Sequence, residues 1–152
     1  MKDLSKTQKI IIIAVIILLL FVMFNVFWMC WRNIRYSHYT EGLEEFRKHY
    51  SYVLTADDGY LFNAKLPDYP TFTGNLCVAT LDNKVALIIW PNVLSGYHYG
   101  TQIEMDGEVY CIELDENLCA RQAYFDDMIK ENEDTIQLLN EKAECMWKIS
   151  KQ

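Results

Sequence analysis

The longest run of apolar side chains lies close to the N-terminus. Residues 10–31 form a block of 22 residues in which Asn25 is the one strongly polar member. As an α-helix this block would span roughly 33 Å, slightly more than the roughly 30 Å hydrocarbon core of a bilayer. Three aromatic side chains stand among its last five residues, as expected at a membrane–water interface. The pattern predicts a transmembrane helix over residues 10–31, preceded by a short basic tail over residues 1–9.

A buried core helix and a cleaved signal peptide both fit the apolar block less well. A buried core helix would need a larger domain around it, because the block is apolar on every side. A cleaved signal peptide has a shorter apolar region, about 7–15 residues, and a cleavage site flanked by small residues. Here the block ends in bulky side chains, which also argue against lipoprotein processing at Cys30. We therefore expect an uncleaved signal anchor.

The basic residues on the two sides of the block are nearly balanced. Three lysines precede it, and Arg32 and Arg35 follow it closely. Because a nine-residue tail offers little chain to translocate, we expect a cytoplasmic N-terminus and a domain outside the membrane. Asn25 has two interpretations: an amide tolerated near the outer interface, or a hydrogen bond to another transmembrane helix, typically worth about 1 kcal/mol.

Beyond the block, apolar side chains recur at intervals of three or four residues. They are Tyr36, Tyr39, Leu43, Phe46, Tyr50 and Val53. This spacing predicts a juxtamembrane helix over residues 32–51 that packs against the domain, although Gly42 interrupts it at a cost near 1 kcal/mol. A coiled-coil stalk is the alternative, but two heptads are fewer than such a stalk needs.

The middle of the chain has the pattern of antiparallel hairpins over residues 52–114. Turn sequences stand at residues 57–59, 82–84 and 106–107, and the last of these, Asp-Gly, is the strongest hairpin signal. The predicted strands cover residues 52–55, 60–65, 76–81, 85–90, 101–105 and 108–114. Residues 85–90 are apolar throughout, which predicts a central strand covered on both faces. Two longer loops, over residues 66–74 and 91–100, join the hairpins.

The C-terminal part predicts a long amphipathic helix over residues 118–149. This stretch has no Gly or Pro, and its apolar residues fall within about a third of the helix circumference. Asn132 lies on the apolar side of this helix. The helix is therefore either continuous, with one polar residue among the apolar ones, or broken near Asn132. Together these elements predict an α+β domain over residues 52–152, with an antiparallel sheet of about 4–6 strands packed by the C-terminal helix.

Charge is distributed unevenly along the chain. The 152 residues carry a formal charge of −7, yet the 121 residues after the apolar block hold 20 of the 21 acidic groups and 11 of the 14 Lys and Arg. A domain of net charge −9 argues against nucleic acid or anionic lipid as a partner and would steer cationic partners. From Glu104 to Asp134 only Arg121 and Lys130 oppose 11 carboxylates. The Asp-x-[Asp/Asn]-x-[Asp/Asn]-Gly order of a calcium loop is missing there, so we expect a solvated acidic face.

Four cysteines follow the apolar block: Cys77, Cys111, Cys119 and Cys145. They are either reduced and buried or paired in an oxidising compartment. A bridge between Cys111 and Cys119 closes the shortest loop, and pairing Cys119 with Cys145 would require a break in the C-terminal helix. No Cys-x-x-Cys pair is present, which disfavours a zinc site.

We find no catalytic or cofactor motif. There is no P-loop, Gly-x-Gly-x-x-Gly, His-Glu-x-x-His or Gly-x-Ser-x-Gly sequence. His38 and His49 would lie about 16 Å apart on one helix, too far to share a metal. We therefore expect no cofactor, no metal and no enzymatic activity.

The aromatic residues give the clearest functional hint. Tyr69 and Phe72 lie in the first predicted long loop, and Tyr97, His98 and Tyr99 in the second. Tyrosine suits recognition surfaces because it supplies contact area and a hydroxyl group at low entropic cost. The sequence thus predicts a single-pass membrane protein whose domain binds a protein partner outside the membrane. The alternative is an accessory subunit of a membrane assembly, joined through Asn25 and the juxtamembrane stripe.

Overall fold

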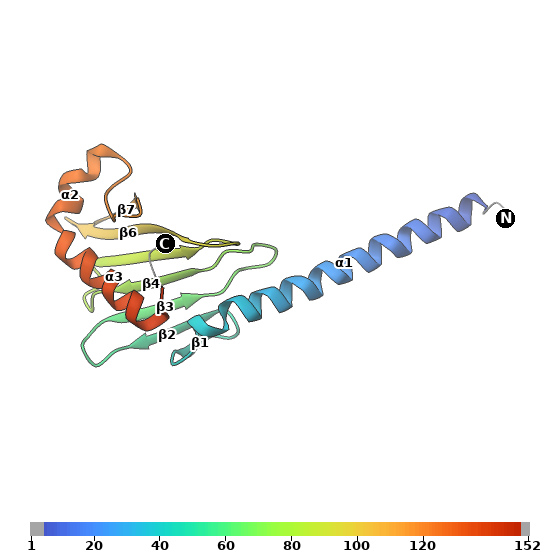
Figure 1. Cartoon of the computed structure of the whole chain (residues 1–152), viewed down its shortest axis with the longest axis horizontal. Helices are drawn as coiled ribbons and strands as arrows, with labels where there is room; N and C mark the ends of the chain where they lie inside the picture. The colour runs from blue at the N-terminus through green and yellow to red at the C-terminus, as the bar shows by residue number, and fades with distance from the viewer. Residues whose placement is uncertain (1–4, 150–152) are drawn as a thin grey trace. The chain divides into compact units, whose positions relative to one another are not determined.

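The computed structural model describes residues 5–149 and divides the chain into two units, Met1–Arg35 and Tyr36–Gln152 (Figure 1). The first unit is made by helix α1, Lys6–Tyr36. Ser5 caps its start: the Gln8 main-chain N–H donates to Ser5 Oγ at 3.3 Å, and the Ser5 N–H donates to Gln8 Oε1 at 3.0 Å. Residues 6–9 of the predicted tail are therefore helical, whereas residues 1–4 lie outside the described residues.

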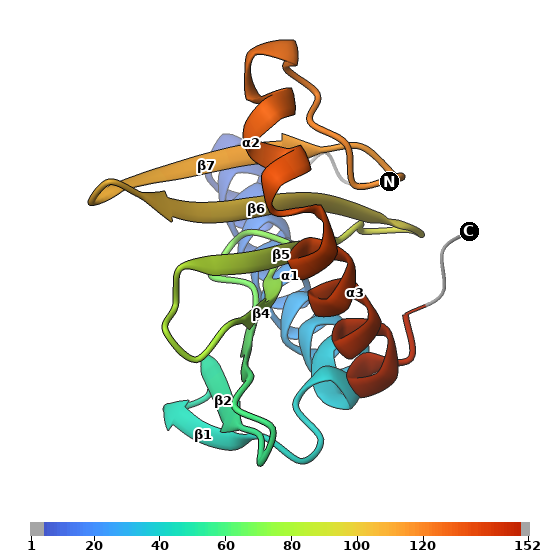
Figure 2. The same cartoon turned by 90° about the vertical axis from the view of Figure 1, so that its left-hand side faces the viewer.

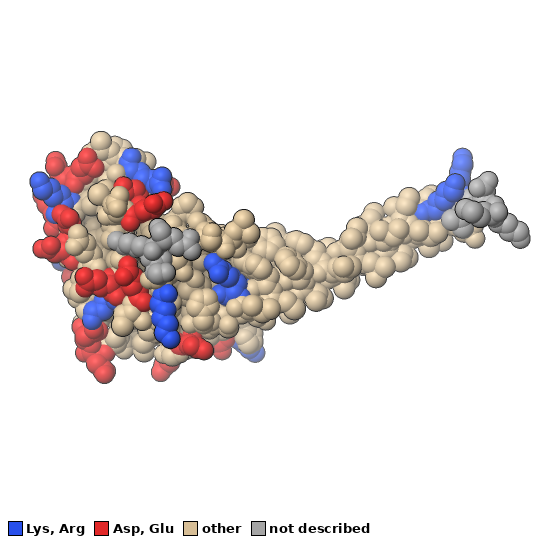
Figure 3. Space-filling view, viewed as in Figure 1, with Lys and Arg blue, Asp and Glu red and all other residues tan. Residues whose placement is uncertain are grey.

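Helix α1 is long enough and apolar enough to cross a bilayer. Its most apolar 18-residue window has a mean hydropathy of 3.3, and none of that window is buried by the rest of the chain. A core helix would bury its apolar surface instead. In Figure 3 most of the helix carries no Lys, Arg, Asp or Glu.

The predicted juxtamembrane helix over residues 32–51 is wrong beyond residue 36. Helix α1 ends at Tyr36, a 3₁₀ turn covers Ser37–Tyr39, and strand β1 covers Glu44–Arg47. Gly42 lies between them with φ of +77°, a left-handed conformation that no helix continues through. The compact domain accordingly begins at Tyr36 instead of residue 52.

Seven strands form one antiparallel sheet in which sequence order is also spatial order. After β1 come β2 Ser51–Thr55, β3 Leu61–Lys65, β4 Asn75–Ala79, β5 Val85–Pro91, β6 Tyr97–Met105 and β7 Glu108–Leu114. The predicted hairpins are confirmed, but the expected 4–6 strands become seven. The additional strand, β1, is exposed at every residue and lacks the apolar signal of a strand, as a charged edge strand often does.

The hydrophobic core lies between one face of the sheet and the C-terminal helix. Helix α3, Glu133–Trp147, packs on β4 and β5, as Figure 2 shows. Fully buried side chains meet there from both layers: Leu76, Val78, Leu87, Ile89, Ile136 and Leu139. On the other face, Ile88 and Trp90 of β5 are only half-buried. Strand β5 is central, as predicted, because β4 and β6 flank it, but its second face is covered less completely than its core face.

The predicted helix over residues 118–149 is shorter and interrupted. A 3₁₀ turn at Ala123–Phe125 leads into α2, Asp126–Glu131, and Asn132 separates α2 from α3. The Asn132 side chain donates from Nδ2 to the Met128 carbonyl at 2.9 Å, a local bond that competes with a continuous helix. Before the helices, Ala120 forms a β-bridge with Leu114, so this stretch is extended.

Candidate functional site

The segment that leads into the domain is held by buried aromatic side chains. Tyr36 and Tyr39 are each 1 % exposed, and their rings meet edge to face at 5.6 Å. The Gly74 main-chain N–H donates to the Tyr36 hydroxyl at 2.7 Å, and the Trp147 indole N–H donates to the Tyr39 carbonyl at 3.0 Å. The start of the domain is thereby joined to the loop over residues 66–74 and to the end of α3.

Tyr97, His98 and Tyr99 lie on strand β6 and not in the loop predicted over residues 91–100. They pair with Pro91, Trp90 and Ile89 of β5. Tyr99 also pairs with Leu114, the last residue of β7, so β6 extends two residues further than β7 at this end of the sheet. The sequence predicted this strand only from residue 101, because Gly100 is typical of a loop. In the structure Gly100 belongs to β6 and is buried under Trp90.

Two adjacent cavities adjoin this extension of β6. One has a volume of about 400 Å³ and the other of about 500 Å³, both within the usual size of ligand sites. Five residues line both: Asn92, His98, Tyr99, Leu114 and Arg121. The sequence-predicted Tyr97, His98 and Tyr99 therefore belong to a hollow region, which we call the β6 site.

The floor of the larger cavity is an indole ring that the sequence did not reveal as a site residue. Trp90 lines this cavity and crosses over Gly100, where an added Cβ would lie 2.9 Å from Trp90 Cζ3. Gly100 thus leaves the ring room to lie close to β6. Because Trp90 stands in an apolar run that is typical of a core strand, nothing in the sequence separates it from its buried neighbours.

Arg121 is the second site residue that the sequence did not reveal. Its Nε donates to the Leu114 carbonyl at 3.2 Å, and its main-chain N–H donates to the Glu113 carbonyl at 3.0 Å. These bonds fix the base of an exposed guanidinium at the end of β7. In the sequence, Arg121 stands out only as one of two cations within an acidic stretch.

Carboxylates outnumber cations around the β6 site. Glu113 lines the larger cavity, and Asp115 and Glu116 line the smaller one, against Arg121 alone among Lys and Arg of the two linings. Asp115 is held in place because its Oδ1 accepts main-chain N–H groups from Asn117 and Cys119, both at 2.9 Å. These three carboxylates and one guanidinium sum to a formal charge of −2.

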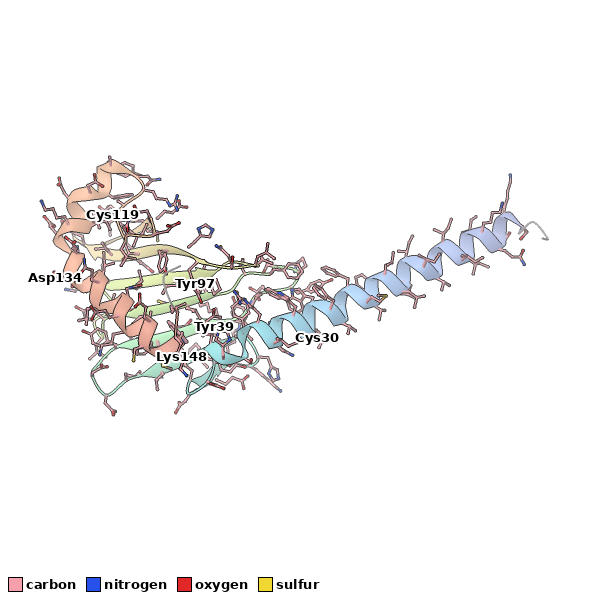
Figure 4. All side chains as sticks on the ribbon, viewed as in Figure 1. Cys30, Tyr39, Tyr97, Cys119, Asp134 and Lys148 are labelled. Carbon is pink, nitrogen blue, oxygen red and sulfur yellow. The ribbon has the colours of Figure 1, made fainter. Side chains whose placement is uncertain are left out.

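The two phenols of the site differ in their surroundings. Burial raises the pKa of Tyr99 above its ordinary value, and the nearby Glu144 carboxylate raises this pKa further. The Tyr97 hydroxyl lies 3.3 Å from the Tyr39 hydroxyl, and Figure 4 shows the two side chains close together. Tyr97 therefore links the β6 site to the segment at the start of the domain.

The other predicted aromatic residues lie outside the two cavities. Tyr69 and Phe72 are in the loop over residues 66–74, as expected, where Tyr69 is exposed and Phe72 half-buried. Neither residue lines the β6 site. The sequence placed all five predicted residues in loops, but only those of β6 come together.

The structure separates the four cysteines of the domain, and all are free. Cys77 on β4 and Cys111 on β7 are three strands apart, about 14 Å, whereas a bridge needs Cα atoms within about 7 Å. Cys119 lies beside Asp115, four residues or about 13 Å along β7 from Cys111, so the structure does not bring this pair within bridging distance. Cys145 lies on α3, across the sheet from Cys77 and Cys111.

The Asn25 side chain forms one hydrogen bond within its own helix. Its Nδ2 donates to the Phe21 carbonyl at 2.7 Å. A contact between Asn25 and a second transmembrane helix stays a prediction. Among residues 5–149, no three His, Cys, Asp or Glu side chains converge closely enough to hold a metal ion.

Comparison with known proteins assigns no family to this arrangement. No protein-family model, no curated protein and no solved structure matches the chain. Function must therefore be inferred from the chemistry of α1 and of the β6 site.

Proposed function

We propose that the chain is a single-pass membrane protein whose domain binds a cationic side chain of a protein partner at the β6 site. Residues 10–31 would anchor it, with the N-terminus in the cytoplasm and the domain outside. The observation that carries the proposal is an excess of carboxylates around two adjoining cavities, one lined by two phenols and the other by an indole ring on the opposite face of the sheet.

This combination suits a Lys or Arg side chain. Such a cation gains when it stands over the face of Trp or Tyr, by about 0.5–2 kcal/mol, and it would reduce the negative charge of the linings. Tyr97 and Tyr99 supply hydroxyl oxygens that accept hydrogen bonds from the remaining N–H donors. The guanidinium of Arg121 adds selectivity, since a partner must place a carboxylate or carbonyl group near it.

The charge of the whole domain supports the same class of partner. A net charge of −9 over residues 32–152 attracts basic surfaces over a distance and speeds their encounter. We propose binding in preference to catalysis, because the β6 site offers recognition groups without a recognisable nucleophile–base pair.

Charge reversal at the site tests this proposal in full-length protein in native membranes. One variant carries Glu113→Lys and Glu116→Lys; the control carries Glu104→Lys and Glu131→Lys. All four residues are exposed, and the control residues line neither cavity. Both variants change the net charge equally. After extraction in mild detergent, we expect the site variant to lose co-purified proteins that the control retains. Equal retention, or equal loss, would contradict the proposal.

A further inference from the structure

We propose that the loops over residues 66–74 and 92–96 rest in the interfacial layer of the bilayer, with Val93 and Leu94 in contact with lipid. This inference rests on the proposed anchorage through residues 10–31 but not on the β6 site. It assigns a membrane-contact surface to one end of the sheet.

The chain enters the domain between these two loops. Tyr36 accepts the hydrogen bond from Gly74, the last residue of the first loop, and Tyr39 lies 3.3 Å, hydroxyl to hydroxyl, from Tyr97, which follows the second loop. Only five residue steps lead from Trp31, the end of the apolar block, to Tyr36. Even fully extended, they span at most about 18 Å. Covalent reach alone therefore keeps this end of the sheet close to the membrane.

Apart from the exposed Asp68 of the first loop, the tips of these loops have the side chains expected at such a surface. Leu94 is 91 % exposed, Tyr69 49 % and Val93 45 %. Residues 85–103, which include the second loop, contain no Asp, Glu, Lys or Arg. A leucine this exposed at a turn contributes no buried apolar area to the stability of the fold. Apolar and aromatic side chains together are typical of the interfacial layer of a bilayer.

The opposite end of the sheet is charged. Because turns alternate between the two ends of an antiparallel meander, the turns over residues 56–60, 80–84 and 106–107 lie together there. They carry Asp57, Asp58, Asp82, Lys84 and Asp106. In Figure 3 acidic side chains gather at the left-hand end of the domain.

Two other connections share the end of the sheet with the apolar loops. Asp115 and Glu116 follow β7, which stops two residues short of the start of β6, so they are set back from the loop tips. The turn between β1 and β2 contributes Lys48, a side chain that suits lipid headgroups. Neither connection opposes contact between the loop tips and the membrane.

Site-specific crosslinking in vesicles tests the inference. The full chain is reconstituted in phosphatidylcholine vesicles with a photoreactive diazirine amino acid at position 94 or, as a second site, position 93. The control position is 81, because Leu81 is also apolar and 65 % exposed but lies in a turn at the opposite end. We expect lipid adducts at 93 and 94 and none at 81.

Flotation of the same vesicles separates the two proposals. Protein that floats but forms no lipid adduct at 93 and 94, or forms equal adducts at 81, overturns the membrane-contact surface and leaves the anchor intact. Adducts to a second protein at 93 and 94 in place of lipid overturn it as well. A chain that fails to float overturns the anchorage itself, and with it this inference.

Discussion

Tyr36 shows how one hydroxyl group can hold a segment to a domain. Its oxygen accepts the buried Gly74 N–H, and at Gly74 an added Cβ would lie 2.1 Å from the Lys65 carbonyl oxygen. A glycine is thus required where the backbone of this loop runs closest to its neighbours. Removing the hydroxyl would leave a buried N–H group without its acceptor.

We therefore expect Tyr36→Phe to lower the free energy of unfolding by about 1–3 kcal/mol. Tyr124→Phe is the matched control, because Tyr124 is exposed and its hydroxyl bonds only to the nearby exposed Gln122. Urea unfolding of the full chain in detergent, followed by tryptophan fluorescence, measures both. Equal effects of the two substitutions would show that the buried hydrogen bond contributes no more to the free energy of unfolding than the exposed one.

The thiols of the domain differ in reactivity for a physical reason. Burial raises the pKa of Cys77 to about 11, whereas Cys111, Cys119 and Cys145 are exposed. Because only the thiolate reacts, we expect iodoacetamide at pH 8 to modify the three exposed cysteines and to leave Cys77 unmodified until the protein is denatured. Peptide mass mapping before and after denaturation measures this. Fast modification of Cys77 in the folded protein would contradict its burial.

Single residues also show how far the sequence predicts the candidate site. Tyr97, His98 and Tyr99 are recognisable because aromatic residues stand beside glycines, but Trp90 and Arg121 are not. Trp90 belongs to the site only because Gly100, ten residues later, makes room for it. Arg121 belongs to it because the chain folds back along β7 after residue 115. Such pairings are tertiary and leave no local pattern.

Among the elements, the hairpins are predictable from the sequence and the end of the first helix is not. The Asp106-Gly107 turn has φ of +55° and +78°, which few residue pairs other than Asn-Gly or Asp-Gly adopt, so the sequence itself specifies it. The apolar residues from Tyr36 to Val53 are spread over four different elements, so their helix-like spacing does not come from one continuous helix. Apolar spacing alone does not reveal that α1 ends at Tyr36 or that the chain turns at Gly42, which is in the left-handed conformation.

Helix α3 is fastened to the turn between β2 and β3 by a charge pair. Lys142 forms a salt bridge with Asp58, and its ammonium group lies 4.9 Å from the centre of the Tyr60 ring. The Lys142 side chain lowers the pKa of Asp58 and has its own pKa raised in return. Both groups are solvent-accessible, so the contribution is modest and sensitive to salt.

The lowered pKa of Asp58 fixes the direction of a pH dependence. A carboxyl group with a depressed folded-state pKa stabilises the fold above its unfolded pKa, about 3.9, and loses that contribution as pH falls through the folded value. We expect Asp58→Asn to reduce the free energy of unfolding at pH 7 and to have a smaller effect at pH 2. Urea unfolding at both pH values checks this. The exposed Asp57→Asn is the control, and the same loss in both variants would contradict the assignment.

At the scale of the whole molecule, the division between an apolar helix and an acidic domain is clear from the sequence. The apolar block is longer than any strand or core helix of the domain requires. The basic residues on its two sides are nearly equal in number, however, so charge alone does not favour one orientation.

We expect a protease added to intact cells to remove the domain and to leave the anchor with the membrane. Cleavage sites for trypsin are available because Arg47, Lys48 and Lys65 are exposed. Immunoblotting for the domain before and after lysis measures its accessibility. Protection in intact cells followed by cleavage after lysis would place the domain in the cytoplasm.

We expect residues 10–31 to remain part of the protein and to hold it in the membrane. The direct measurement is the intact mass of the protein recovered from membranes after alkaline washing, compared with that in the wash. We expect the protein to stay in the membrane pellet with a mass that includes residues 10–31. A shortened chain in the wash, lacking those residues, would identify a cleaved signal peptide and contradict the proposed anchor.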